Sequence, residues 1–119
     1  SRRKSFQYYI KKLSNIDGIL LPNTEKLEEN ACHLFIIRFD QEKFGLSRNE
    51  IFEELLKMGI STSVHYKPLS FFSIFKKNAK SYASLKNSIR LYDEILSLPF
   101  YTGITSKEQD VVIKSIKSL

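Results

Sequence analysis

A histidine and a lysine, His65 and Lys67, stand two residues apart near the end of a segment that is expected to be extended. Alternate residues of a strand project from the same face, so these two side chains would point the same way. An imidazole and an ammonium group side by side can grip a carboxylate or a phosphate. Pro68 follows at once and restricts the backbone after the pair. His65 and Lys67 are therefore candidate ligand-binding residues, and a surface or hydrogen-bonded structural role is the alternative for His65.

His65 and Lys67 lie at the end of a predicted unit made of a helix, a glycine and a strand. Ser47 and Glu50 have the spacing of a capping box, which predicts a helix start. Gly59 fits the left-handed position after the helix. The buried stripe expected for this helix consists of Ile51, Phe52, Leu55 and Leu56. We predict a strand over residues 60–66, with one face made of Ile60, Thr62, Val64 and Tyr66 and a polar face made of Ser61, Ser63, His65 and Lys67. Tyr66 is therefore expected in the core.

The rest of the chain supplies the other elements of an α+β domain. Helical periodicity indicates a first helix whose apolar face holds Phe6, Tyr9, Ile10 and Leu13. Strands are predicted over 33–39 and 95–98, with a short extended piece over 19–22 and a loop over 40–46. Residues 68–80 are irregular or hold a short helix, and a helix spans Tyr82 to Tyr92. A capping box at Thr105 and Glu108 opens the last helix. Together these elements predict about four helices around a small sheet of about three strands.

Composition indicates one soluble globular domain. The chain has 119 residues, of which 42% are hydrophobic and 27% charged, and its net charge is +6. No apolar run approaches the ~20 residues needed to span a bilayer, and no signal peptide is visible, so we expect no membrane and a cytoplasmic location. Cys32 is the only cysteine, which excludes an internal disulfide. The basic charge suits an anionic partner, but no nucleic-acid recognition motif is present, so we expect no nucleic acid.

Few other residues suggest chemistry. The sequence contains no glycine-rich phosphate loop, no Gly-x-Ser-x-Gly and no His-Glu-x-x-His, so we assign no catalytic residue and no metal site. Phe100 and Tyr101 could stack on a ring or fill the core. Arg38 and Asp40 could form a surface ion pair without a function.

Several motifs in order resemble one enzyme family. They are a His-x-Phe strand at 33–35, Gly-Ile-x-Thr-x-Val-His-Tyr at 59–66 with Pro-Leu at 68–69, and Leu-Ser-Leu-Pro at 96–99. Together they resemble the C-terminal domain of the DegT/DnrJ/EryC1/StrS sugar aminotransferases. Two departures from the family's motifs weaken the transfer of functional roles to single residues of this chain. Ser70 stands where many members have a second histidine. The usual second proline of the Leu-Ser-Leu-Pro segment is replaced by Gly103 or is absent, depending on the alignment.

The resemblance implies that residues 1–119 are the single C-terminal small domain of a fold-type I aminotransferase, and that the large domain is absent from this chain. It implies pyridoxal phosphate as cofactor, bound mainly by that large domain, which also carries the Schiff-base lysine. The fragment should then be inactive by itself. The full-length enzyme would move an amino group from glutamate to a nucleotide-linked keto sugar for bacterial polysaccharide biosynthesis, as a homodimer.

By the same resemblance, His65, Lys67, Tyr66, Phe100 and Tyr101 are substrate-binding residues. His65 and Lys67 would lie near a carboxylate or phosphate, and the loop of Phe100 and Tyr101 at the edge of the site. Two alternatives stay open: a pyridoxal-phosphate sugar dehydratase of the same family, and a stand-alone basic binding module.

Overall fold

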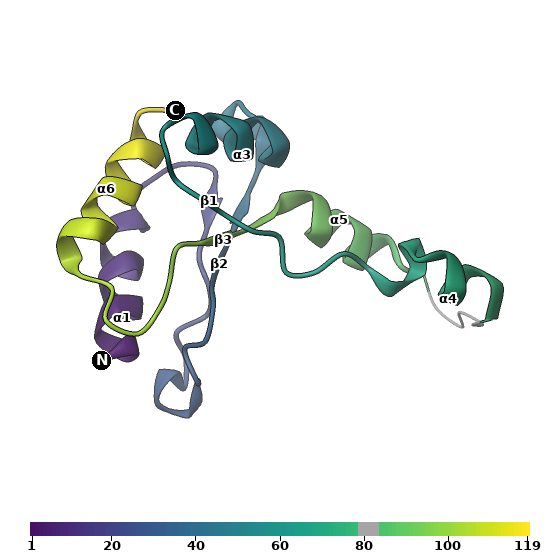
Figure 1. The fold of residues 1–119 in the computed structure, drawn as a ribbon, viewed down its shortest axis with the longest axis horizontal. Helices are drawn as coiled ribbons and strands as arrows, with labels where there is room; N and C mark the ends of the chain where they lie inside the picture. The colour runs from purple at the N-terminus through teal and green to yellow at the C-terminus, as the bar shows by residue number, and fades with distance from the viewer. Residues whose placement is uncertain (79–83) are drawn as a thin grey trace.

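A three-stranded antiparallel sheet organises the body of the protein in the computed structural model, which describes residues 1–78 and 84–119 (Figure 1). The strands are β1 (Ile19–Leu20), β2 (Phe35–Phe39) and β3 (Ile95–Leu98), in the order β1-β2-β3. In the β2–β3 ladder, Phe35 pairs with Leu98 and Ile37 with Leu96. These four side chains share one face and are almost fully buried. The predicted α+β class with a small sheet is confirmed.

Helix α1 (Arg2–Leu13) packs on this apolar face. The rings of Phe6 and Tyr9 each lie with their centroids 4.8 Å from that of Phe35. The Tyr9 hydroxyl donates to the Pro99 carbonyl at 3.0 Å, so the helix is also tied to the end of β3. Burial of the Tyr9 phenol raises its pKa far above the ordinary value of 10.0. The predicted face of the first helix therefore forms the centre of the core.

Two capped helices complete the body. Helix α6 (Ser106–Lys117) lies beside α1, and α3 (Arg48–Lys57) contacts β3 (Figure 1). Both predicted capping boxes are present, at Ser47 and at Thr105. Gly59 follows α3 with φ of 80°, as predicted. Leu55 is fully buried, but the expectation for Leu56 was wrong, because its side chain is 51% exposed.

The segment expected to be a loop after β2 contains a short helix, α2 (Gln41–Phe44). The Asp40 carboxylate caps it by accepting hydrogen bonds from the backbone N–H groups of Glu42 and Lys43. Asp40 N–H in turn donates to the Gly18 carbonyl at 2.8 Å. Gly18 has φ of 81°, and a Cβ there would lie 2.5 Å from the Phe44 nitrogen, so the turn requires glycine. The loop prediction failed because a cap at Asp40 supports one helical turn.

The predicted strand over 60–66 was wrong as a regular element. It is an extended segment that meets β3 at one isolated bridge, between Ser63 and Ser97. The alternation of buried and exposed residues holds from Ile60 to Ser63 and then ends. Tyr66 is 72% exposed and not part of the core. Without further ladder hydrogen bonds, nothing maintains the two-residue period beyond the bridge.

Residues 66–78 and 84–92, which we call the arm, project from the body (Figure 1). The described part of the arm contains the 3₁₀ helix η2 (Leu69–Phe71) and helix α4 (Ser73–Asn78), and helix α5 (Lys86–Glu94) leads back into β3. The helix predicted from Tyr82 thus begins at Lys86, and Tyr82 lies outside the described residues. A second 3₁₀ helix, η1 (Leu27–Glu29), precedes β2. In residues 1–78 and 84–119, no helix is long and apolar enough to cross a membrane.

Six α-helices are therefore described, where about four were expected. The four expected helices correspond to α1, α3, α5 and α6. The two additional ones, α2 and α4, have four and six residues. Helix α4 lies in residues 68–80, where an irregular segment or a short helix was expected, and α2 was not predicted. A helix as short as α2 carries too few residues for an apolar periodicity to be recognised.

Candidate functional site

A groove opens where the extended segment 60–67 passes into the arm, and we call it the His65 groove. Its volume is about 440 Å³. Residues 65–70 form one wall, and the other wall comes from α5 and the first residue of β3, through Leu85, Ser88, Leu91, Tyr92 and Ile95. Three predicted site residues, His65, Tyr66 and Lys67, line this groove together.

His65 is held by β3. Its Nδ1 lies 2.8 Å from the Ser97 hydroxyl. Ser97 is buried, and its backbone exchanges two hydrogen bonds with Ser63, at 2.7 and 3.1 Å. The bridge between Ser63 and Ser97 therefore fixes both Ser97, which contacts the imidazole, and the extended segment to which His65 belongs. Ser97 engages Nδ1, and no hydrogen bond to Nε2 comes from residues 1–78 or 84–119, so Nε2 can face a ligand.

Lys67 and Ser70 add polar groups to the same wall. The Lys67 ammonium lies 5.4 Å from the centre of the Phe72 ring, a cation–π contact on an otherwise exposed side chain. Among the described residues, the buried Ser70 hydroxyl has no hydrogen-bond partner. A buried hydroxyl without a partner is costly unless a ligand or water satisfies it. An imidazole, an ammonium and a hydroxyl in one groove suit the oxygen atoms of an anionic group.

The structure separates Phe100 and Tyr101 from this groove. Phe100 packs in the aromatic core, with its ring centroid 6.0 Å from that of Phe6 and 6.2 Å from that of Phe35. The Tyr101 hydroxyl donates to the Glu108 carboxylate at 2.9 Å, which raises the pKa of the tyrosine. The carboxyl of Glu108 has a lowered pKa, chiefly because it accepts from the Thr105 backbone N–H. A substrate-binding role for Phe100 and Tyr101 stays a prediction.

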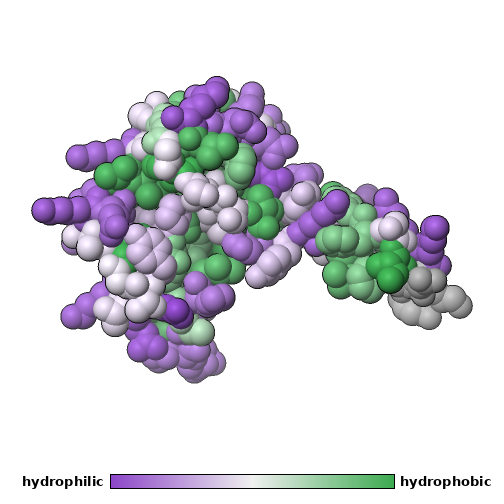
Figure 2. All heavy atoms as spheres, in the orientation of Figure 1, coloured by the Kyte–Doolittle hydropathy of each residue, from purple (hydrophilic) through white to green (hydrophobic). Residues whose placement is uncertain are grey.

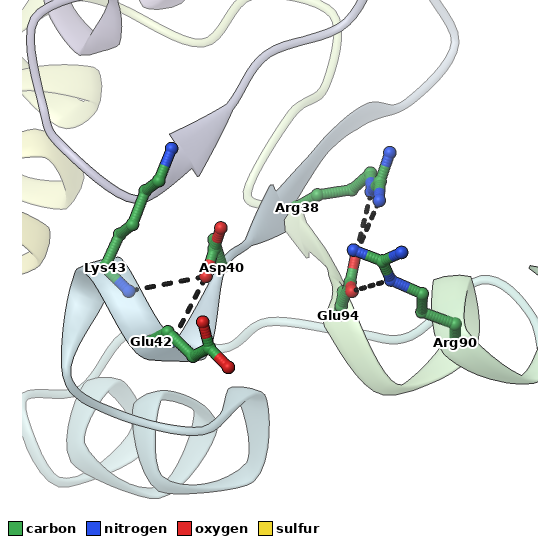
Figure 3. Close-up of polar contacts among 6 residues, drawn as sticks. All are labelled: Arg38, Asp40, Glu42, Lys43, Arg90 and Glu94. Atoms are coloured by element: carbon green, nitrogen blue, oxygen red, sulfur yellow. Dashed lines mark hydrogen bonds and ion pairs between the residues drawn. The ribbon is translucent and has the colours of Figure 1, made fainter.

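A cluster of charges missed by sequence reasoning connects the arm to the sheet (Figure 3). The Glu94 carboxylate accepts from Arg38 through Nε at 3.1 Å and Nη2 at 2.6 Å, and from Arg90 Nε at 2.8 Å. Burial alone would raise the pKa of Glu94, but the hydrogen bonds from Arg90 and Arg38 outweigh it, so the pKa is lowered. Arg38 therefore pairs with Glu94, and Asp40 is the cap of α2. The spacing of Arg90 and Glu94, four residues apart on a helix, was the available signal.

Arg48 makes the second connection at the base of the arm. Although charged, it is buried, with its guanidinium 5.0 Å from the centre of the Tyr92 ring. Its Nη1 donates to the Ile95 carbonyl at 3.3 Å. Tyr92 also meets Phe71 edge to face at 5.7 Å. These contacts position the α5 wall of the His65 groove relative to α3.

The described residues offer no other reactive centre. In residues 1–78 and 84–119, no three His, Cys, Asp or Glu side chains are grouped so that they could hold a metal ion. Cys32 is buried and forms no disulfide. The His65 groove is the candidate site because it brings together three of the residues predicted to bind a ligand, His65, Tyr66 and Lys67.

Comparison with known proteins identifies the family. The family model of the DegT/DnrJ/EryC1/StrS aminotransferase family matches residues 1–117. The chain belongs to this family. The spore coat polysaccharide biosynthesis protein SpsC of Bacillus subtilis is 27% identical over 113 residues, which are 93% of this chain and 29% of SpsC.

Solved structures of aminotransferases share the fold. The putative sugar aminotransferase Spr1654 of Streptococcus pneumoniae, in its PMP form, is 29% identical with a TM-score of 0.79, and the match covers 98% of this chain and 29% of Spr1654. PseC of Helicobacter pylori, an aminotransferase involved in pseudoaminic acid biosynthesis, has a TM-score of 0.79 at 24% identity, over 99% of this chain and 32% of PseC. The chain thus spans about a third of the length of these three proteins.

Proposed function

We propose that residues 1–119 are the C-terminal small domain of a pyridoxal-phosphate-dependent sugar aminotransferase. The observation that carries the proposal is the match to Spr1654, which covers nearly the whole chain but only 29% of that enzyme. Spr1654 is known in PLP and PMP forms. The proposed reaction takes an amino group from glutamate and gives it to a nucleotide-linked keto sugar. The enzyme is proposed to be a cytoplasmic bacterial homodimer.

The exposure of the lysines supports a large domain that holds the cofactor. In the part of the chain that the structure describes, every lysine is exposed. A lysine that forms a Schiff base is usually activated by a desolvated or electrostatically special environment. None of the described lysines has such an environment, which agrees with a Schiff-base lysine outside this chain. Bound pyridoxal phosphate would supply the electron sink for the reaction.

The role proposed for this domain is to bind and orient the substrate. Lys67 attracts a phosphate or carboxylate group, and His65 binds the same group through Nε2. The Ser70 hydroxyl, buried without a partner among the described residues, donates a third hydrogen bond. Tyr66 is exposed beside them, where its ring can cover the bound group. Fixing an anionic group on three donors orients the reacting part of the substrate.

The proposal is tested in the full-length enzyme with glutamate and a panel of nucleotide-linked keto sugars. Wild type should form the amino sugar. Lys67→Met should raise KM for the anionic substrate by about tenfold, because it removes a charge that binds the ground state and the transition state alike. Lys57→Met is the matched control, since Lys57 is exposed on α3 and pairs with Glu54.

Each alternative has its own outcome in these assays. Formation of a dehydrated sugar without amino transfer would replace the aminotransferase by a dehydratase of the same family. Salt-sensitive binding of DNA or RNA by the isolated chain, with no turnover of any sugar, would favour the basic binding module. An unchanged KM in Lys67→Met would contradict the proposal that the His65 groove binds the substrate.

A further inference from the structure

We propose that a second cavity, separated from the His65 groove by α5, binds a neutral aliphatic α-amino acid as its zwitterion. We call it the Arg48 pocket, and its volume is about 950 Å³. It lies between the segment 39–45, which includes α2, the first residue of α3, and α5. The α5 residues that line it are Lys86, Ile89, Arg90, Asp93 and Glu94. None of these five lines the His65 groove. Figure 2 shows hydrophilic residues where α5 joins the body.

Arg48 places a buried positive charge at this pocket. Its side chain is only 7% exposed. Nε donates to the Asn49 side-chain oxygen at 2.8 Å and Nη1 to the Ile95 carbonyl at 3.3 Å, and both acceptors are neutral. Within residues 1–78 and 84–119, no carboxylate pairs with Arg48 and no acceptor engages its Nη2. Residues 79–83 contain no Asp or Glu. A buried charge without a counter-ion is costly, so an anionic ligand group would stabilise it.

Acidic side chains line the rest of the pocket. They are Asp40, Glu42, Asp93 and Glu94. Glu94 is already paired with two arginines, and Asp40 caps α2. In the described part of the chain, the side chains of Glu42 and Asp93 form no ion pair. Figure 3 shows Asp40 and Glu42 on one side of this space and Arg90 with Glu94 on the other.

These charges act across the pocket. The pKa of Arg90 is raised, chiefly by its hydrogen bond to Glu94 and to a smaller extent by the charges of Asp40 and Glu42. The carboxylates of α2 therefore lie close enough to favour a positive charge on the opposite wall. The exposed Asp93 and Glu42 can favour a positive charge on a ligand in the same way.

Charges of both signs in one cavity favour a ligand that carries both. A phosphate would meet Glu42 and Asp93 as well as Arg48, and a metal ion or an amine would meet the buried guanidinium. The carboxylate of an α-amino acid can accept from Nη2 of Arg48, and its ammonium can donate to Asp93. Ile89, which is 37% exposed, adds apolar surface for an aliphatic side chain. L-leucine combines the three features and is the probe.

Equilibrium dialysis of the full-length enzyme with radiolabelled L-leucine tests the site. Binding is measured without turnover, so the result does not depend on the proposed reaction. Two competing analogues each lack one charge: 4-methylpentanoate has no ammonium group, and leucinamide has no carboxylate. Each should bind about tenfold more weakly than L-leucine, the loss expected for one charge-assisted contact. Equally tight binding of either analogue would overturn the zwitterion.

Variants assign the two charges to residues. Asp93→Asn should weaken L-leucine about tenfold and leave 4-methylpentanoate unchanged, because only the ammonium loses its partner. Arg48→Lys should weaken L-leucine and 4-methylpentanoate but not leucinamide. If Arg48→Lys does not fold, Asp93→Asn still decides, because Asp93 is exposed. Glu53→Gln is the control: Glu53 is exposed on α3 outside the pocket, and its replacement should change nothing.

Amide hydrogen exchange locates the ligand. L-leucine should slow exchange in α2 and α5 of wild type, and should do so less in Asp93→Asn. Complete displacement of L-leucine by L-glutamate, with no effect of Asp93→Asn, would place leucine at an amino-donor site and overturn the inference. Failure of wild type to retain L-leucine would overturn it as well. Amino transfer by an enzyme that retains no leucine would leave the proposed reaction intact.

Discussion

Arg38 in the middle strand and Glu94 at the end of α5 form a two-pronged ion pair, in which Nε and Nη2 of the arginine both donate to Oε2 of the glutamate. The two residues are 56 positions apart in the sequence. Glu94 immediately precedes β3, and Arg38 pairs with Ile95 in the ladder. The ion pair therefore sets the angle at which the arm leaves the sheet.

Replacing Glu94 tests this connection. Glu94→Gln removes the charge that two guanidinium groups share and should lower the free energy of unfolding by about 1–2 kcal/mol. Amide hydrogen exchange in α5 should become faster. The control is Glu54→Gln, which breaks the exposed pair with Lys57 and should leave both measurements unchanged. Equal effects of the two variants would refute a special role of Glu94.

Acid should destabilise the domain through three glutamates. Glu50, Glu94 and Glu108 all have a pKa below the ordinary value of 4.5 in the folded state. The folded state then binds fewer protons than the unfolded state, so their stabilisation is complete above the ordinary pKa. It is lost as the pH falls through the lowered values. Urea denaturation at a series of pH values below about 5 should show this loss.

Glu94→Gln supplies the control for the acid effect. The variant lacks one of the three titrating groups, so its stability should fall less steeply with decreasing pH than that of wild type. Parallel curves for the two proteins would show that Glu94 has the same pKa in both states.

Substitution of two neighbouring leucines on α3 should lower the free energy of unfolding by very different amounts. Leu55 is fully buried and Leu56 is 51% exposed. Leu55→Ala should cost about 2–5 kcal/mol of unfolding free energy, because it leaves a cavity in the core. Leu56→Ala should cost less than about 1 kcal/mol. Denaturant midpoints of the two variants give the comparison, and similar values would place both side chains in equivalent environments.

Ser97 should act on the proposed reaction through His65. Ser97→Ala removes the hydroxyl at 2.8 Å from Nδ1 and releases the ring. In the full-length enzyme we expect KM for the anionic substrate to rise severalfold while kcat changes less, because binding is affected more than chemistry. Ser97→Thr keeps a hydroxyl and should restore part of the affinity. A loss of kcat with unchanged KM, and no rescue by threonine, would contradict this positioning role.

The sequence predicted those elements that carry a strong local signal. Two capping boxes, the left-handed glycine at 59 and the strand β2 all depend on residues close in the chain, and all are present. The motif around His65 pointed to three residues, His65, Tyr66 and Lys67, that line one groove, and their role in binding stays a prediction. Local signals sufficed because each describes one turn or one strand.

The features that were missed depend on contacts over long distances in the chain. Tyr66 follows a regular alternation, yet it is exposed, because only one bridge holds this segment to β3. Leu56 fits an apolar stripe as well as Leu55 does, and only the packing of α3 on the body distinguishes them. The partner of Arg38 could not be read from its neighbours, since Glu94 comes close only when β3 pairs with β2.

The antiparallel pairing of β2 with β3 has a consequence for the order of folding. Residues 40–94, including the arm, must all be looped out before the ladder can form. Closing so long a loop costs chain entropy and slows folding. During synthesis, β2 emerges well before β3, so the central strand must wait for its second neighbour. Lengthening or shortening the arm should therefore alter the folding rate more than the final stability, because loop entropy grows only slowly with loop length.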